Sequence, residues 1–206
     1  MTTGRYAVDA GGSGTAVRAF GGGWQLPSIN PCSDGAAAAD AALADLLGSI
    51  AADVRGRQLA GARVWLAAAS AGHDRPETER ARLAAAVRDV PVPLAITLCN
   101  DVDALVLACL AEAGTVVAVC GTGSGVVAAS PAAGVVRVGG EEYLAGDQGS
   151  AYDLGRAALR AAARALDGRG PATALTGELA GAGGCPVPEL GRRLAGLPHA
   201  KRAVAA

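Results

Sequence analysis

A short strand, a glycine-rich turn and a second short strand occur twice in this chain. The first copy places Gly-Gly-Ser-Gly at 11–14 between the apolar runs 5–10 and 15–20, and the second places Gly-Thr-Gly-Ser-Gly at 121–125. Glycine-containing turns between short apolar runs predict β-hairpins. Because the two turns lie roughly a hundred residues apart, the pattern predicts two related domains with a cleft between them.

Strand patterns alternate with helix patterns along the rest of the chain. Continuous apolar or β-branched runs predict further strands at 24–26, 62–69, 94–99, 116–120, 125–129 and 135–138. Alanine- and leucine-rich segments predict helices at 35–54, with Asp34 as N-cap, and at 77–88, 103–112 and 149–166, with one more before the C-terminus. This alternation predicts an α/β protein with a largely parallel sheet.

The charge balance excludes several classes of partner. Lys and Arg total 18 and Asp and Glu total 19, so no net field attracts nucleic acid or an anionic membrane over long range. The longest apolar stretch, 104–120, is interrupted by Glu112 and Gly114 and is shorter than the ~20 residues of a spanning helix. The first residues lack the apolar core of a signal peptide. We expect a cytoplasmic protein with no nucleic-acid or membrane partner.

The five cysteines are an odd number and lack CxxC spacing. This pattern favours neither a disulfide framework nor a zinc cluster. Those within apolar runs are expected to be small buried hydrophobic residues in a reducing compartment.

The two glycine-rich turns are candidate phosphate-binding loops. Backbone N–H groups and hydroxyls can surround phosphate oxygens where glycine lets the main chain approach closely. The candidates are Gly11, Gly12, Ser13, Gly14 and Thr15 in the first turn, and Gly121, Thr122, Gly123 and Ser124 in the second. Asp9, at the end of the preceding strand, is a candidate for holding Mg²⁺ through water. Plain hairpin turns remain the alternative.

A carboxylate follows the strand at 94–99. Asn100 and Asp101 stand where a parallel strand ends, the edge at which open α/β sheets usually place their chemistry. Phosphoryl transfer to an alcohol requires a group that orients the hydroxyl and accepts its proton, and an aspartate suits this role. The alternative is capping of the next helix by Asp101 or Asp103. We favour catalysis for Asp101 and capping for Asp103.

These segments together resemble a known family. The residues that carry the resemblance are Val8 to Thr15, Asn100-Asp101, Gly121 to Ser124, Gly139-Gly140 and Gly146 to Arg156. They are similar to the N-acetylglucosamine kinase and BadF/BadG/BcrA/BcrD ATPase family, over about Tyr6 to Ala163. The resemblance implies an actin-like ATPase (ribonuclease H-like) fold. It also implies transfer of the ATP γ-phosphoryl, with Mg²⁺, to the 6-hydroxyl of an amino sugar.

The resemblance assigns roles to individual residues. It implies that the two turns bind phosphate, that Asp101 is the catalytic residue, and that Asn30 and Asp147 contact the sugar, with Asn100 in the same substrate site. Asn and Asp side chains supply the directional hydrogen bonds that sugar hydroxyls require. The alternatives are turn formation by Asn30 before Pro31 and capping by Asp147 of the helix that follows.

The chain departs from the family pattern at two places. Glu141-Glu142 stand where the family usually has Trp-Gly, so Glu141 is a candidate substrate contact and the free ammonium of glucosamine is favoured over an acetamide. The family's adenosine-binding segment has no counterpart after Leu166. We therefore expect a complete first domain at 1–113 and an incomplete second domain at 114–206. Three functions stay open: an amino-sugar kinase, including one acting on N-acetylmuramic acid, a non-catalytic sugar or nucleotide binder, and a remnant that needs a partner chain. A homodimer is left open as the assembly.

Overall fold

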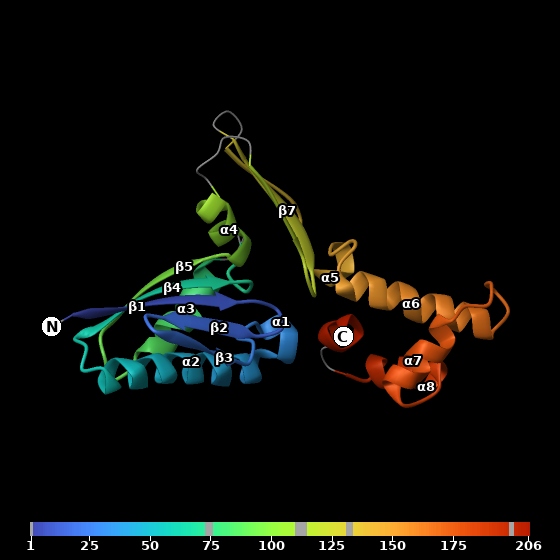
Figure 1. Ribbon diagram of the computed structural model, residues 1–206, viewed down its shortest axis with the longest axis horizontal. Helices are drawn as coiled ribbons and strands as arrows, with labels where there is room; N and C mark the ends of the chain where they lie inside the picture. The colour runs from blue at the N-terminus through green and yellow to red at the C-terminus, as the bar shows by residue number, and fades with distance from the viewer. Residues whose placement is uncertain (1, 73–75, 110–114, 131–133, 198–199) are drawn as a thin grey trace. The chain divides into compact units, whose positions relative to one another are not determined.

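The computed structural model describes residues 2–72, 76–109, 115–130, 134–197 and 200–206 (Figure 1). The chain divides into two compact units, one formed by Met1–Val117 and Val127–Val136, the other by Ala118–Val126 and Arg137–Ala206. The last residues of the expected helix at 103–112 lie outside the described residues. Within the described residues, no helix is long and apolar enough to cross a membrane.

The first unit contains a five-stranded mixed sheet with the strand order β3-β2-β1-β4-β5. Its strands are β1 (Thr3–Ala10), β2 (Thr15–Ala19), β3 (Gly22–Leu26), β4 (Gly61–Ala68) and β5 (Leu94–Cys99). The first three form antiparallel hairpins, whereas β1, β4 and β5 run parallel. The expected parallel sheet is therefore confirmed only for its second half, because the two tight turns force β2 and β3 to reverse direction.

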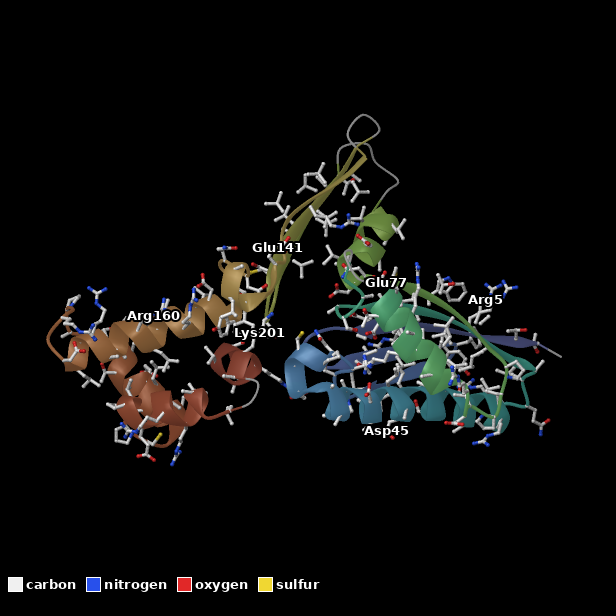
Figure 2. All side chains as sticks on the ribbon, turned by 180° about the vertical axis from the view of Figure 1, so that it is seen from behind. Arg5, Asp45, Glu77, Glu141, Arg160 and Lys201 are labelled. Atoms are coloured by element: carbon white, nitrogen blue, oxygen red, sulfur yellow. The ribbon has the colours of Figure 1, made fainter. Side chains whose placement is uncertain are left out.

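Two helices cover one face of this sheet. The helix α2 (Ala36–Gly56) runs along the sheet and α3 (Pro76–Val87) lies beside α2 (Figures 1 and 2). The core between them is formed by alternate strand residues, including Tyr6, Val8, Val64 and Leu66, and by one stripe of α2. Strand side chains alternate between faces, so the odd-numbered residues of β1 and β4 face away from this core.

A short helix separates β3 from α2. It is α1 (Pro31–Asp34), capped by Asn30, whose side chain accepts a hydrogen bond from the backbone N–H of Cys32. Gly35, with φ of 89°, then redirects the chain into α2. The expectation that Asp34 caps α2 is wrong, because Asp34 is the last residue of α1.

The second hairpin forms a three-stranded sheet with the order β6-β7-β8. Its strands are β6 (Val116–Cys120), β7 (Ser124–Ser130) and β8 (Gly134–Gly139). In the first unit, Val127 and Ala129 of β7 pack against Val106 of α4 (Asp101–Cys109). The repeat of the hairpin that the sequence predicts is confirmed.

The second unit ends in a group of helices. They are α5 (Glu142–Ala145), α6 (Ala151–Leu166), α7 (Leu175–Gly183), α8 (Val187–Ala195) and α9 (Ala200–Ala205). The expectation of a single helix after α6 is wrong. Pro186 and Pro188 stand at the start of α8, where proline is tolerated because the first helical N–H groups need no intrahelical acceptor. Gly184, with φ of 62°, ends α7.

The cysteine expectation is only partly met. Among the cysteines whose side chains are described, all are free, Cys185 is buried, Cys99 is half-buried, and Cys32 and Cys120 are exposed. Cys120 is exposed although it ends an apolar run, and its thiol donates to the carbonyl oxygen of Gly149 at 3.2 Å.

Candidate active site

The parallel strands of the first sheet bring several candidate residues to one edge. Asp9 lies near the end of β1, beside Ala67 of β4. Asn100 and Asp101 follow directly on β5. The Nδ2 atom of Asn100 donates to the carbonyl oxygen of Ala71, just beyond β4, at 3.2 Å. The carboxyl ends of β1, β4 and β5 thus form one edge of the sheet, at which Asp9, Asn100 and Asp101 lie.

Asp101 is half-buried at the first position of α4. Burial raises the pKa of its carboxyl group, and the negative charges of Asp9 and Asp103 raise it further, while hydrogen bonds from backbone N–H groups oppose the increase. A carboxylate with a raised pKa is a better proton acceptor than an exposed one, because its affinity for a proton is higher. Asp9 lies at the same edge of the sheet, because β1 and β5 both run parallel to β4.

The cap of α4 comes from Asn100. Its Oδ1 atom accepts a hydrogen bond from the N–H of Val102 at 3.0 Å, and Oδ1 of Asp101 accepts from the same N–H at 2.9 Å. Because α4 begins at Asp101, Asp103 lies inside its first turn. The expectation that Asp103 caps this helix is wrong, and part of the hydrogen-bonding capacity of Asn100 is used by the protein.

The first glycine-rich turn leaves several backbone donors without protein acceptors. Gly11 N–H donates to Gly14 O at 3.0 Å. No acceptor among the described residues contacts the N–H groups of Gly12, Ser13 or Gly14. Ser28 supports the turn, because its hydroxyl donates a hydrogen bond to the carbonyl oxygen of Gly11 at 2.8 Å. Consecutive N–H groups of this kind suit an anion such as phosphate.

Packing does not explain why this turn contains glycine at 11 and 12. A Cβ atom at Gly11 would meet its nearest neighbour at 3.9 Å, as would one at Gly12, which faces the hydroxyl of Ser33. Neither has a positive φ. The main chain at these two glycines is therefore open to close approach by a group from outside the folded chain.

Thr15 differs from the rest of the turn. It is the first residue of β2 and fully buried, and its Oγ1 atom has no hydrogen-bond partner within the described part of the chain. A side chain enclosed in this way cannot touch a ligand at the surface. The structure therefore separates Thr15 from the four exposed or half-buried residues before it.

Asp9 is exposed at the end of β1. Mg²⁺ usually keeps several water molecules and binds through one or two carboxylates together with phosphate oxygens. An exposed carboxylate near Asp101 and next to the turn fits this mode of binding.

The loop before Asn30 is held by ion pairs of Arg82 that the sequence did not reveal. The side chain of Asn30 caps α1, which is the turn-forming alternative considered above. The carbonyl oxygen of Ile29 accepts a hydrogen bond from Arg82 of α3 at 2.8 Å, and Arg82 also pairs with Glu79 at 3.0 Å and with Asp40. Arg82 thus fixes the loop that carries Ser28 and Asn30. An Arg three residues after a Glu in a helix is a common surface pattern and gives no sign of this role.

The second glycine-rich turn packs against Asp147. The Oδ1 atom of Asp147 accepts from the N–H of Ser124 at 2.8 Å, and a Cβ atom at Gly123 would lie 2.6 Å from this same oxygen. Glycine at 123 is therefore explained by packing. Gly121 meets nothing within 4 Å, and the N–H groups of Thr122 and Gly123 have no acceptor within the described residues.

Lys201 completes the surroundings of Asp147. Its Nζ atom lies 2.6 Å from Oδ2 of Asp147, which is 3 % exposed, and 5.8 Å from the ring centre of Tyr143. Lys201 comes from α9, the last helix (Figure 2). Asp147 has a φ of 62°, and Ser150 rather than Asp147 caps α6. The capping alternative for Asp147 is therefore wrong, and a lone lysine near the C-terminus gave no signal for this contact.

Glu141 is exposed and follows Gly139 and Gly140, which both have positive φ values. The backbone of Gly140 lies 3.7 Å from the position of a Cβ atom at Gly125, so these paired glycines allow the strand ends to approach closely. The side chain of Glu142 lies outside the described residues.

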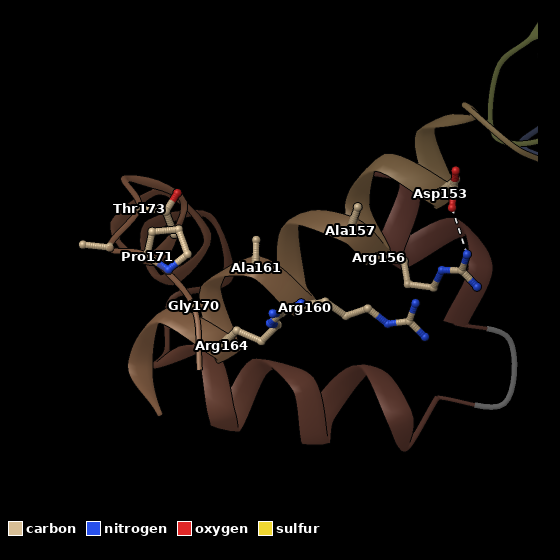
Figure 3. A pocket seen from close by; sticks show the side chains of 10 residues that line it. Asp153, Arg156, Ala157, Arg160, Ala161, Arg164, Gly170, Pro171 and Thr173 are labelled. Carbon is tan, nitrogen blue, oxygen red and sulfur yellow. Dashed lines mark hydrogen bonds and ion pairs between the residues drawn. The ribbon is translucent and has the colours of Figure 1, made fainter. Parts of the chain in front are cut away.

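A pocket of about 580 Å³ lies elsewhere in the second unit, along α6 (Figure 3). Arg156, Arg160 and Arg164 line it together with Gly170 to Thr173, and Arg156 pairs with Asp153 at 2.9 Å. None of the predicted site residues lines this pocket.

Solved structures define the class of protein to which this fold belongs. A provisionally named N-acetylglucosamine kinase from Chromobacterium violaceum matches 99% of this chain and 72% of its own chain, with a TM-score of 0.72 and 22% identity. A similarly named protein from Porphyromonas gingivalis matches with a TM-score of 0.70 and 18% identity, over 100% of this chain and 70% of its own. MreB5 of Spiroplasma citri bound to ADP matches with a TM-score of 0.51 and 17% identity, over 81% of this chain and 58% of its own. The fold is that of the actin-like ATPases.

The family is narrower than the fold. The model of the BadF/BadG/BcrA/BcrD ATPase family matches residues 64–204, more than half of the chain, so this chain belongs to that family. An N-acetylmuramic acid/N-acetylglucosamine kinase from Clostridium acetobutylicum is 29% identical over 110 residues, which are 53% of this chain and 36% of that protein. The match thus spans about a third of this relative.

Proposed function

We propose that this chain is part of an ATP-dependent sugar kinase that transfers the γ-phosphoryl group of ATP to a hydroxyl of an amino sugar. The observation that carries the proposal is the half-buried Asp101 at the carboxyl end of β5, with its raised pKa, close to Asp9 and in the same unit as a turn with free N–H donors. The names of the curated relative and of two solved structures support the same reaction.

In this proposal each residue has a defined task. The N–H groups of Gly12, Ser13 and Gly14 in the first unit bind phosphate oxygens, and in the second unit the N–H groups of Thr122 and Gly123 are suited to the same ligand. Asp9 holds the water shell of Mg²⁺. When bound, MgATP supplies the phosphoryl group and neutralises charge on it. Asp101 orients the sugar hydroxyl and accepts its proton during attack on the γ-phosphorus.

Asn30, Asn100, Asp147 and Glu141 form the proposed sugar contacts. In the present arrangement Asn30 and Asn100 use their Oδ1 atoms to cap helices, which leaves the amide N–H₂ groups as the donors for sugar oxygens. Asp147 is paired with Lys201, so its role toward a sugar is indirect unless this pair opens. Glu141 is exposed and can pair with an ammonium, which favours glucosamine over N-acetylglucosamine.

A coupled assay of ADP release tests the function and the substrate together. We expect turnover with glucosamine to exceed that with N-acetylglucosamine and N-acetylmuramic acid, and Glu141→Gln to reduce this preference. Higher turnover with an acetylated sugar would contradict the proposed preference for glucosamine but would still support the proposed kinase activity. Binding of sugar and ATP without turnover of any sugar would contradict the kinase and favour a non-catalytic binder.

A further inference from the structure

The face of the first sheet that lies opposite α2 and α3 carries an unusual set of exposed residues. Arg5 of β1, Arg18 of β2, and Arg63 and Trp65 of β4 all lie on this face and are exposed, as are the smaller residues Ala7, Ala95 and Thr97. We call these residues the arginine face. It lies entirely within the first unit, and Arg5 extends from β1 on it (Figure 2).

Strand register brings like charges together on the arginine face. Arg5 of β1 is the direct neighbour of Arg63 in β4, and in the next row Arg18 neighbours Ala7, which neighbours Trp65. Like charges on directly neighbouring strand positions are destabilising. Among the described residues, no ion pair reaches Arg5, Arg18 or Arg63. The charge on this face is therefore not balanced by the part of the chain that the structure describes.

Trp65 gives the same face an apolar centre. It is 46% exposed although β4 is an inner strand of the sheet. Its row neighbours are Ala7 and Thr97, so the indole ring stands above smaller side chains. A hollow of about 240 Å³ adjoins Arg63, lined also by Thr3, Pro93 and Ala95. A large exposed indole on a sheet face is typical of an interaction surface.

The architecture indicates which kind of element covers such a face. Sheets with parallel central strands are usually covered by helices on both faces, and here α2 and α3 cover only one. A helix that lies on the arginine face would place apolar side chains on Trp65 and acidic side chains near Arg5, Arg18 and Arg63. A single-stranded nucleic acid fits less well, because its bases stack on several aromatic side chains and this face has one.

We propose that the arginine face is the docking surface for an acidic amphipathic polypeptide helix. The occupant has aliphatic residues on one side and flanking Asp or Glu, which pair with Arg5, Arg18 and Arg63. Asp9 lies at the far end of the same strand, four residues after Arg5 and thus about 13 Å away. Its negative charge favours a helix that stays at the arginine end, so the candidate active site stays open. This proposal rests on the fold and not on the proposed kinase activity.

The test uses the full chain and a designed helical peptide with leucines on one side and glutamates beside them. We expect the peptide to bind with a blue shift of tryptophan fluorescence that is absent in Trp65→Phe, because Trp24 is tied to Ser49 by a hydrogen bond. Arg63→Glu and, as a milder change, Arg63→Gln should weaken binding, the first by about tenfold or more. Arg80→Glu, at an exposed position of α3, is the matched control and should bind normally.

Four results would overturn the proposal. They are absence of binding, equal binding by Arg63→Glu, equal binding of a peptide with lysines in place of the glutamates, and displacement of the peptide by a single-stranded oligonucleotide at lower concentration. Sedimentation provides a further check. If the wild type is a dimer and Arg63→Glu dissociates it, the occupant of the arginine face is a second copy of the chain. This result would also contradict the proposed acidic amphipathic helix.

Discussion

The Nζ atom of Lys201 lies 2.6 Å from the Oδ2 atom of Asp147, while Oδ1 of the same carboxylate accepts the N–H of Ser124. The last helix of the chain is thereby connected to the second glycine-rich turn through one buried side chain. The side chain of Lys201 is 19% exposed, so the pair is largely shielded from water. Shielding strengthens the attraction, and it also makes the loss of either partner costly.

Removal of Lys201 should therefore destabilise the fold more than removal of the whole pair. We expect Lys201→Met to lower the free energy of unfolding by about 3 to 5 kcal/mol, because it leaves the carboxylate of Asp147 buried without its cation. The double variant Lys201→Met with Asp147→Asn should recover part of this loss. Urea unfolding followed by circular dichroism measures both. Equal losses in the single and double variants would show that the cost does not come from a carboxylate left without its cation.

The two glycines of the second turn should respond differently to alanine. Gly121→Ala should leave the fold unchanged, since its Cβ would meet nothing within 4 Å, and should weaken ATP binding if the main chain there contacts phosphate. Gly123→Ala should lower stability by about 1 to 3 kcal/mol, because its Cβ would lie 2.6 Å from Asp147. Calorimetric titration with ATP and thermal unfolding separate the effects. Unchanged ATP affinity of a folded Gly121→Ala variant would identify this turn as a plain hairpin.

Asp101 should act mainly in the transition state. We expect Asp101→Asn to reduce kcat by roughly 10² to 10⁴-fold with little change in the affinities for ATP and sugar, since a general base contributes about this factor. Asp103→Asn is the matched control on the same turn of α4 and should retain most of the activity. Full kcat in the Asp101→Asn enzyme would mean that another group accepts the proton.

The raised pKa of Asp101 also makes stability depend on pH. The folded state binds the proton of Asp101 more tightly than the unfolded state does, because the pKa of this carboxyl group is raised on folding. The stability that the protonated carboxyl group contributes is complete below the unfolded pKa and is lost as pH rises through the folded pKa. Asp101→Asn should therefore be more stable than the wild type at pH ~7, and this difference should shrink as pH falls toward about 4. Urea unfolding of both proteins at several pH values measures the difference. A difference that is independent of pH would contradict the assigned shift.

The sequence determined the elements that depend on local patterns. The glycine turns between apolar runs predicted both hairpins, and the apolar runs predicted β4 and β5, because side-chain periodicity and turn geometry act over a few residues. It missed α1 and took Asp34 as the cap of the next helix, whereas Gly35 separates α1 from α2. It predicted one helix where α7, α8 and α9 follow, because Pro186 and Pro188, which suggested breaks, occupy the start of α8.

The candidate site was likewise predictable from the sequence only in part. Asp9 with the first turn, and Asn100-Asp101, could each be placed at a strand end from sequence, and the parallel pairing of β1, β4 and β5 brings these ends to one edge. Sequence could not show that Gly123 is required by Asp147, that Lys201 pairs with that carboxylate, or that Arg82 holds the loop before Asn30. These contacts join segments far apart in the chain. Their partners are chosen by packing in three dimensions, which no local pattern records.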